Sequence, residues 1–413
     1  MFAIIILALV LLLISMRQFV KISFSIPQVM AAGALIVLLF GSISIRDAFS
    51  SVKWEMIIFL FCMFVLSAAL ESSGLLEEAM NALMGKSEGK KQAVLLLIIF
   101  FALGSAFLVN DALAVIAAPM VIYLSAKMGM EPKPLLLICC FAITIGSMAT
   151  PIGNPQNLLV ALDFAVGEPF SAFFTYLFLP ALASLIFLYF LSPILWKNLF
   201  SGKKIEMSNI PMVRDKPLAK LCASSIFLFA LLFILHLIFP NAGLPLWWIA
   251  APPALLLLIL SSRRKELFLH VEWGTLLFFI SMFVLMQSVW NEGIFQQALA
   301  QNSKLLNPSD PISVSFISVI LSQFISNVPM VALYLPILHG AKATIFSYMA
   351  LAGASTLAGN LTILGAASNI ILIEGARKRG VHISFFEFLK YGIVFTAIPI
   401  LLMLGWFAIF GAL

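Results

Sequence analysis

The stretch VKWEMIIFLFCMFVLSAALESSG, residues 52–74, decides the fold because the chain contains a second version of it. Residues 271–293 read VEWGTLLFFISMFVLMQSVWNEG and align with it without gaps, so that Trp54 matches Trp273. Each stretch is apolar over about the 20 residues that a helix needs to cross a bilayer. The first feature that the sequence predicts is therefore an internal repeat of membrane-spanning segments.

Two further blocks follow each copy of this segment in the same order. FLVNDALAVIAAP (107–119) aligns with FISNVPMVALYLP (324–336), and TIGSMATPIGNPQN (144–157) aligns with TLAGNLTILGAASN (356–369). Three matching blocks in one order are hard to obtain by chance. We therefore expect the two halves of the chain to share one plan.

The composition of the 413 residues is that of a polytopic membrane protein. Hydrophobic residues make up 62% and charged residues only 10%, whereas a soluble domain carries about 25% charged residues. Ten apolar segments are predicted to span: 2–16, 27–44, 54–70, 134–149, 170–196, 218–239, 246–262, 273–289, 345–373 and 384–412. Some of them are shorter than the roughly 20 residues of an ordinary spanning helix.

The basic residues predict the orientation in the cell (plasma or inner) membrane. If the N-terminus is outside and the chain crosses ten times, most of the 24 Lys and Arg residues lie in cytoplasmic loops, as the positive-inside rule requires. Both termini are then outside. This topology works only if 93–126 and 312–341 enter and leave on one face. The arm 111–125 supports that, because it gives only about 22 Å of helix. We expect two re-entrant helical hairpins.

The predicted fold is therefore all-α, with two inverted repeats. Each repeat has five spanning helices and one hairpin, and an odd number of spans gives the halves opposite orientations. The first repeat is predicted at 1–196, a cytoplasmic linker at 197–217 and the second repeat at 218–413. Inverted repeats are typical of alternating-access carriers, whose sites lie near the membrane midplane at broken helices.

The hairpin tips supply the first candidate site residues. Asn110 and Asn327 fall at the two tips, and Ser326 precedes the second. Where a helix stops, an amide side chain can bond free backbone groups or an ion, so helix capping is the alternative reading. Asp111 follows Asn110, and an acid inside the membrane is by default a functional hypothesis. Its match is Val328, so the charge belongs to one half; the alternative is a structural cap.

A second set of candidates comes from TPIGNPQN (150–157) and TILGAASN (362–369), each in the middle of a span. Proline removes a backbone donor and glycine permits unusual conformations, so each span should be broken there. Freed carbonyls can hold a cation, and the next half-helix can face an anion. A packing kink is the alternative reading. The candidates are Thr150, Gly153, Asn154, Asn157, Thr362, Gly365, Ser368 and Asn369.

These motifs resemble the ion transporter superfamily, which includes arsenite permeases, NhaD-type sodium/proton antiporters, the P protein and divalent anion–sodium symporters. The symporters carry Ser-Asn-Thr at each tip, whereas the tips here read Val109-Asn110-Asp111 and Ser326-Asn327-Val328. The Asn-Asp tip and AGNLTILGAASNIIL (358–372) are most similar to arsenite-permease-like members. The resemblance implies a fold of inverted repeats with two hairpins, often a homodimer with a fixed scaffold and a moving transport part.

The sequence thus predicts a secondary active transporter of a small inorganic ion or oxyanion, with proton-coupled arsenite or antimonite efflux as the best guess. By this reading Asp111 carries the proton or cation, and Asn110, Asn327, Asn157 and Asn369 line the substrate cavity. Because the predicted core lacks Lys and Arg, a neutral or weakly charged substrate, or a cation, is favoured. The alternatives are sodium/proton antiport, sodium-coupled dicarboxylate or anion symport and, from another class, an ion channel.

Other functions find no support in the motifs. Paired acids, a Ser/His/Asp set, a P-loop and Cys/His metal spacings are all missing from the sequence, so no enzyme, ATP-driven pump, metal centre or cofactor is predicted. The net charge of +6 reports topology and not nucleic acid. The expected partners are the small ion or oxyanion, a coupling proton or sodium ion, membrane lipid and a second copy of the chain.

Overall fold

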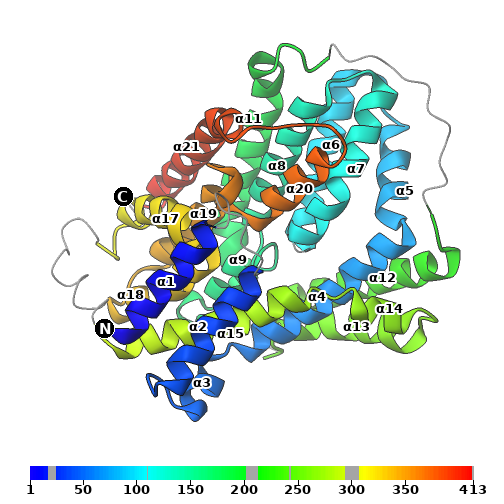
Figure 1. Ribbon diagram of the computed structural model, residues 1–413. Coiled ribbons are helices and arrows are strands. Elements are labelled where there is room, and N and C mark those ends of the chain that lie inside the picture. Colours follow the sequence, from blue (N-terminus) through cyan, green and yellow to red (C-terminus); the bar gives the residue numbers. More distant parts are fainter. Residues whose placement is uncertain (17–24, 109, 201–212, 241–242, 294–306, 412–413) are drawn as a thin grey trace.

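The computed structural model describes residues 1–16, 25–108, 110–200, 213–240, 243–293 and 307–411, and every regular element in these ranges is helical (Figure 1). The elements of the first half are α1 (Phe2–Met16), α2 (Ile26–Leu39), α3 (Ile45–Ser51), α4 (Trp54–Ser73), α5 (Leu75–Met84), α6 (Lys90–Phe107), α7 (Asn110–Met128), α8 (Pro132–Met148), α9 (Pro155–Ala161), η1 (Phe164–Val166), α10 (Pro169–Phe173), the π-helical η2 (Phe174–Phe178) and α11 (Leu179–Leu195). Those of the second half are α12 (Lys216–Ile238), α13 (Trp247–Leu260), α14 (Arg264–Leu269), α15 (Trp273–Asn291), α17 (Pro311–Ile325), α18 (Asn327–Gly340), α19 (Ile345–Ala358), η4 (Ile363–Gly365), α20 (Ala367–Arg377) and α21 (Phe385–Ile409).

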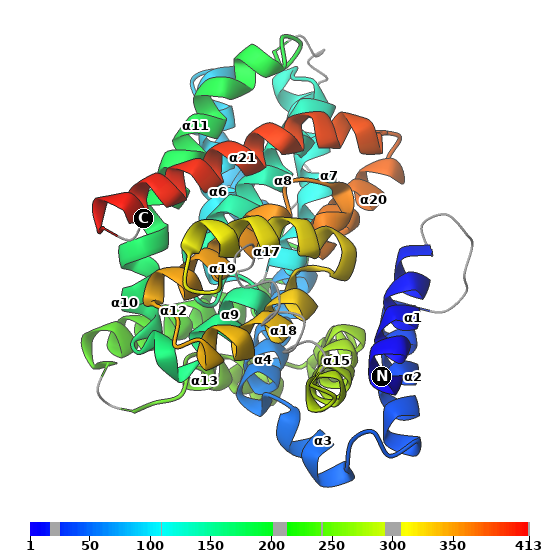
Figure 2. The same ribbon diagram turned by 90° about the vertical axis from the view of Figure 1, so that its left-hand side faces the viewer.

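The helices form two groups that each draw on both halves of the chain. One group, the platform, contains α1–α4 and α12–α15; α2 packs against α15 in it, and α4 packs against α13. The other group, the hairpin bundle, contains α6–α11 and α17–α21, with α7 against α20 and α11 against α21. Figures 1 and 2 show the bundle stacked on the platform.

The lengths of the helices agree with a multi-pass membrane protein and correct the bounds of one predicted segment. Within the described residues, six helical segments are long and apolar enough to cross a membrane: α4, α6, Pro169–Leu195, α12, α15 and α21. Other predicted spans form shorter apolar helices, such as α2 and α13 with 14 residues each. The arm predicted at 111–125 is longer than expected, since α7 has 19 residues, about 28 Å of helix, but its apolar part, Leu113–Met128, is not among the six.

Matched contacts recur at matched positions of the two halves. The indole of Trp54 donates to the carbonyl of Phe49 over 3.1 Å, and the indole of Trp273 donates to the carbonyl of Phe268 over 2.9 Å. Both bonds turn back five residues and fix the start of α4 and of α15 to the short helix in front. The same sequence block therefore makes the same local structure twice.

The entry of the chain into each half is fixed in a related way. The backbone N–H of Arg214, just before α12, donates to the carbonyl of Ser73 at the end of α4 over 3.0 Å. The backbone N–H of Ala3 in α1 donates to Glu292 Oε1, just beyond α15, over 2.7 Å. Ser73 and Glu292 are matched positions in the repeat. Each half thus begins against the end of the matched helix of the other half.

Candidate functional site

The two hairpin tips lie where the repeat predicts them. The first arm α6 ends at Phe107 and α7 begins at Asn110, while α17 ends at Ile325 and α18 begins at Asn327. Between the second pair stands Ser326 with φ of 68°, a left-handed conformation that non-glycine residues seldom adopt. The tip is therefore a tight reversal that ends one helix and starts the next.

Both tip asparagines present a buried oxygen without a partner. Asn110 is 7% exposed and Asn327 is 5% exposed, and the side-chain oxygen of each lacks a hydrogen bond among the described residues. A buried acceptor left unpaired costs about 1–3 kcal/mol. Neither oxygen is used in a helix cap, so each can accept a hydrogen bond from a solute or coordinate a cation. Asp111 is the second residue of α7, but its side chain lies outside the described residues.

The predicted breaks are present in both halves. In the first, α8 ends at Met148 and α9 begins at Pro155, with Asn154 as the N-cap whose side-chain oxygen accepts from the backbone of Asn157 over 2.8 Å. In the second, α19 and α20 are separated by residues 359–366. A proline or a small residue starts each second segment, and the backbone between is irregular.

Matched asparagines form hydrogen bonds across the two breaks. Asn157 Nδ2 donates to the carbonyl of Ser147 over 3.0 Å, and Asn369 Nδ2 donates to the carbonyl of Gly359 over 2.6 Å. Ser147 and Gly359 are themselves matched in the repeat. Both amides are therefore engaged with backbone groups freed by the breaks. Ser368, beside Asn369, is buried and its hydroxyl has no hydrogen-bond partner among the described residues.

Matched threonines connect each break to the hairpin of its own half. The hydroxyl of Thr150 donates to the carbonyl of Ala106, and the hydroxyl of Thr362 donates to Gln323 Oε1 over 2.8 Å. Ala106 and Gln323 are matched positions, because each directly precedes the phenylalanine that begins its tip block, Phe107 or Phe324. The candidate residues of break and tip therefore belong to one connected unit in each half.

The matched glycines of the breaks are required by close packing. A Cβ at Gly153 would lie 2.4 Å from the carbonyl oxygen of Ser147, and a Cβ at Gly365 would lie 2.7 Å from the carbonyl oxygen of Ala358. Both distances are far below van der Waals contact. At these two positions only glycine lets the chain fold back on the end of the preceding helix.

A threonine joins the breaks of the two halves. Thr356 in α19 donates to Asn157 Oδ1 over 3.0 Å and accepts from Asn154 Nδ2 over 3.1 Å. Sequence reasoning did not select Thr356 as a site residue, although the third repeat block contains it as a matched threonine. Gln323 was missed in the same way, next to a tip block. The structure thus brings Asn154 and Asn157 of the first half into contact with Thr356 of the second.

The polar groups buried in the described core are uncharged. They are the hydroxyls of Ser and Thr and the amides of Asn and Gln, and the described residues bury no Lys, Arg, His, Asp or Glu side chain. Such groups both donate and accept hydrogen bonds. The interior around the breaks therefore suits an uncharged, hydroxylated solute or a cation held by oxygen atoms.

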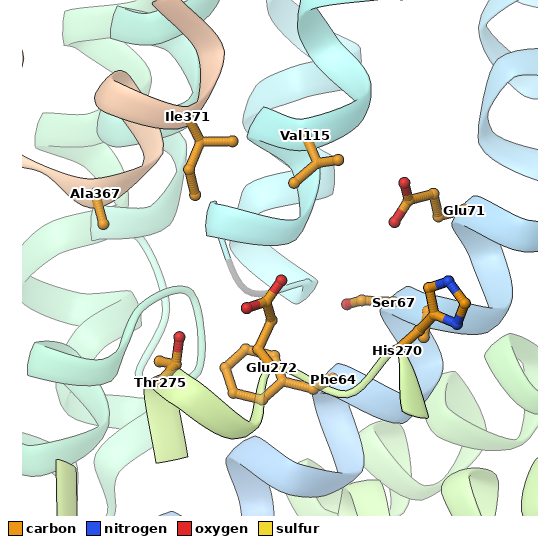
Figure 3. Close-up of a pocket in the computed structure, with 10 residues that line it drawn as sticks. Phe64, Ser67, Glu71, Val115, His270, Glu272, Thr275, Ala367 and Ile371 are labelled. Carbon is orange, nitrogen blue, oxygen red and sulfur yellow. The ribbon is translucent and has the colours of Figure 1, made fainter. Parts of the chain in front are cut away.

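A cavity of about 100 Å³ opens between the platform and the hairpin bundle (Figure 3). Its platform wall carries the polar side chains, and its bundle wall comes from α7 and from α20 near the second break. The lining residues used below are Ser67, Glu71, Val115, His270, Glu272, Thr275, Ala367 and Ile371. Sequence reasoning missed His270 and Glu272, because in front of a span they read as ordinary flanking polar residues.

Comparisons with known proteins agree with this architecture. The family model described as "Citrate transporter" matches residues 9–348. A 46 kDa membrane protein of Mycobacterium leprae is 27% identical, with 90% of each chain covered. A silicon efflux transporter of Oryza sativa subsp. japonica is 28% identical, with 89% of each covered. Among solved structures, the YdaH transporter of Alcanivorax borkumensis has a similar fold, with a TM-score of 0.58, 15% identity and 86% of this chain and 85% of that chain covered.

Proposed function

Because the chain belongs to the citrate transporter family of secondary transporters, we propose that it moves a small, uncharged or weakly charged oxyacid by alternating access. Arsenous acid, the uncharged form of arsenite at neutral pH, is the representative substrate, with efflux as the direction. The arsenite-permease-like tip is one support for this choice. The relative named as a silicon efflux transporter is another, since oxyacids of silicon are also small and hydroxylated.

The observation that carries the proposal is the uncharged buried core. Its described polar groups are amides and hydroxyls, and the tip oxygens of Asn110 and Asn327 are buried and unpaired. Moving an unpaired multiply charged anion into such a site is very costly. A neutral solute with several O–H groups can donate to both tip oxygens and accept from hydroxyls.

The rest of the transport cycle follows the sequence predictions. The halves are inverted repeats in the cell membrane, both termini are outside, and the hairpin bundle moves against the platform. The platform forms the contact between two copies of the chain. Asp111 carries the coupling proton, and its place beside Asn110 at the start of α7 supports a role next to the substrate.

Citrate is the second candidate, because the family model that matches residues 9–348 carries that description. The described core offers a citrate anion no buried Lys or Arg. Citrate would therefore enter as a complex with a cation that neutralises most of its charge. This requirement separates the two candidates experimentally.

The proposal is tested with the purified full-length protein in liposomes. Uptake of labelled arsenous acid, germanic acid and citrate is measured, with citrate offered with and without Mg²⁺. We expect saturable uptake of the neutral acids, lost in Asn110→Ala and Asn327→Ala and kept in the exposed control Asn291→Ala. Saturable uptake of magnesium citrate alone would overturn the choice of substrate and favour the second candidate.

Sodium/proton antiport is tested in everted membrane vesicles that contain the protein. Everted vesicles are energised with a proton gradient, and sodium is then added. We expect the gradient to persist with sodium and to fall when arsenous acid is added. Collapse of the gradient by sodium alone would favour sodium/proton antiport over oxyacid transport as the function.

A further inference from the structure

The cavity of Figure 3 brings together two carboxylates from the two halves of the chain. Glu71 lies near the end of α4, and Glu272 is the N-cap residue of α15. Both line the cavity with His270 and the hydroxyl of Ser67, whose oxygen is buried and has no hydrogen-bond partner among the described residues. In Figure 3 the Glu272 carboxylate points up toward the lower end of α7, and the Glu71 carboxylate points toward α7 from the side.

The facing wall is apolar. Val115 of α7 and Ala367 and Ile371 of α20 line the cavity from the bundle, and Val115 is 37% exposed. If the bundle closes onto the platform, these side chains come down on the two carboxylates. Removing an ionised carboxylate from water costs several kcal/mol without a partner, whereas a protonated one is far cheaper to bury.

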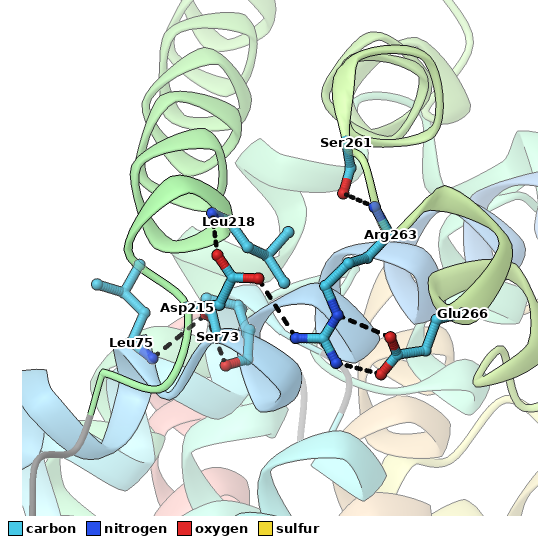
Figure 4. Close-up of polar contacts among 8 residues, drawn as sticks. Ser73, Leu75, Asp215, Leu218, Ser261, Arg263 and Glu266 are labelled. Atoms are coloured by element: carbon cyan, nitrogen blue, oxygen red, sulfur yellow. Dashed lines mark hydrogen bonds and ion pairs between the residues drawn. The ribbon is translucent and has the colours of Figure 1, made fainter.

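The arginine at the start of α14 is already engaged elsewhere. Arg263 pairs with Glu266 and with Asp215, which caps α12 (Figure 4). Two further arginines are also paired, Arg214 with Glu77 and Arg377 with Glu374. Neither Glu71 nor Glu272 has an ion-pair partner among the described residues, and no Lys or Arg lines the cavity.

The remaining titratable group of the lining is His270. One ring nitrogen, Nδ1, lies 2.8 Å from the carbonyl oxygen of Glu266, which ties the ring to α14. The surrounding protein raises the pKa of Glu272, and the nearby carboxylate of Glu71 raises it further. A proton is therefore held more readily here than on an isolated glutamate.

The acidic cavity is built in one half of the repeat only. The positions matched to Glu71 and Glu272 are Trp290 and Lys53, and the position matched to Ser67 is Met286. The matched positions of the repeat therefore carry a bulky aromatic, a basic and an apolar side chain in place of the two acids and the serine. The shared plan of the two halves therefore does not explain these acids. We infer that they have a function on one face of the protein only.

We propose that Glu71 and Glu272 form a proton-binding site that must be loaded before the hairpin bundle closes over this cavity. The inference rests on the proposed function, because it assumes that the bundle moves. A proton from water adds to a carboxylate oxygen of one glutamate, and no other bond changes. High pH therefore holds the cavity open, and low pH permits closure.

The site itself is tested by infrared titration of the full-length protein in liposomes. We expect a protonated-carboxyl C=O band that titrates above the range of an ordinary glutamate. It should be missing from Glu272→Gln and should titrate at lower pH in Glu71→Gln, where the neighbouring charge is gone. The exposed Glu55→Gln variant is the control. Difference spectra of Glu272→Gln that match those of Glu55→Gln would overturn the assignment.

Closure is tested with Val115→Cys and a membrane-impermeant thiol reagent at one fixed high pH. In this background the double change Glu71→Gln and Glu272→Gln removes both charges permanently. We expect the neutral variant to be labelled several-fold more slowly, because its cavity can close. Equal labelling rates would contradict the proposal. Neither test uses a transported solute, so a wrong substrate and a wrong proton site give different results.

Discussion

At the scale of single residues, Asn157 and Asn369 have a structural task. Their amide nitrogens bond carbonyls that the helix breaks leave free, and Asn157 also donates to the carbonyl of Thr150 over 3.0 Å. Buried backbone groups need such partners. The expectation that these asparagines line the cavity remains a prediction, but their bonds already explain why an amide stands at each position.

Removing these amides should therefore lower stability to different degrees. Asn157→Ala leaves several carbonyls unpaired and should cost about 2–4 kcal/mol, since each unsatisfied buried group costs about 1–3 kcal/mol. Asn369→Ala should cost less. Thermal unfolding in detergent measures both against Asn291→Ala, which changes an exposed side chain. An unchanged melting temperature for Asn157→Ala would show that its bonds do not hold the break.

The break glycines give a steric prediction. Gly153→Ala and Gly365→Ala each place a Cβ within 2.7 Å or less of a backbone oxygen, so we expect both to lose thermal stability. Gly405→Ala in α21 is the matched control, because a Cβ there meets nothing within 4 Å. The control should be more stable by up to about 1 kcal/mol. Normal melting of Gly153→Ala would refute the tight packing.

Glu272 gives a pH prediction at the same scale. Its pKa is raised above the ordinary 4.5, so the native protein loses stability as pH rises through that raised value. Glu272→Gln should melt like the native protein at pH 4.5 and above it at pH 8. Glu55→Gln should melt like the native protein at both pH values. Melting curves that stay parallel at every pH would contradict the shift.

At the scale of elements, the broken helices of the two halves depend on each other through Thr356. Thr356→Val keeps the shape but removes the hydroxyl that bonds Asn157 and Asn154. We expect a loss of about 1–3 kcal/mol, because two buried amide groups lose a partner. The melting temperature measures it, with half-buried Thr275→Val as the control. Equal melting of the two variants would show that the link contributes nothing.

The elements also show how far sequence reasoning reaches. Tips and breaks are predictable because asparagine, proline and glycine act on the backbone beside them, and their spacing recurs in both halves. The length of α7 was underestimated, although Lys127 in its last turn, Gly129 with φ of 60° and Pro132 mark its end. The link from Thr356 to Asn157 and the pairing of Glu71 with Glu272 across a cavity arise only from tertiary packing of distant segments.

At the scale of the whole molecule, the platform and the hairpin bundle each combine both halves, as a repeated plan requires. Besides the tryptophan bonds, Gly74 and Gly293 end the first repeat block with φ of 75° and 71°, which glycine adopts without strain. The inverted orientation itself remains a prediction from the basic residues. The orientation can be tested by measuring from which side of the membrane each of two matched loops is accessible.

The matched tryptophan hydrogen bonds should contribute similar amounts to the free energy of unfolding. Trp54→Phe and Trp273→Phe each remove one indole bond to the preceding helix and should each cost about 0.5–1.5 kcal/mol. We expect similar falls in melting temperature, and an additive fall in the double variant, because the sites lie in different helices. A large effect in one half and none in the other would argue against equivalent roles.

Counterflow tests most directly whether this chain is a carrier for small uncharged oxyacids, as we propose. Liposomes that contain the purified protein are loaded with unlabelled arsenous acid and diluted into a trace of labelled arsenous acid. A carrier predicts a transient accumulation of label above equilibrium that saturates with the load and disappears in Asn110→Ala. A flux without overshoot would indicate a channel, and no flux beyond empty liposomes would contradict the account.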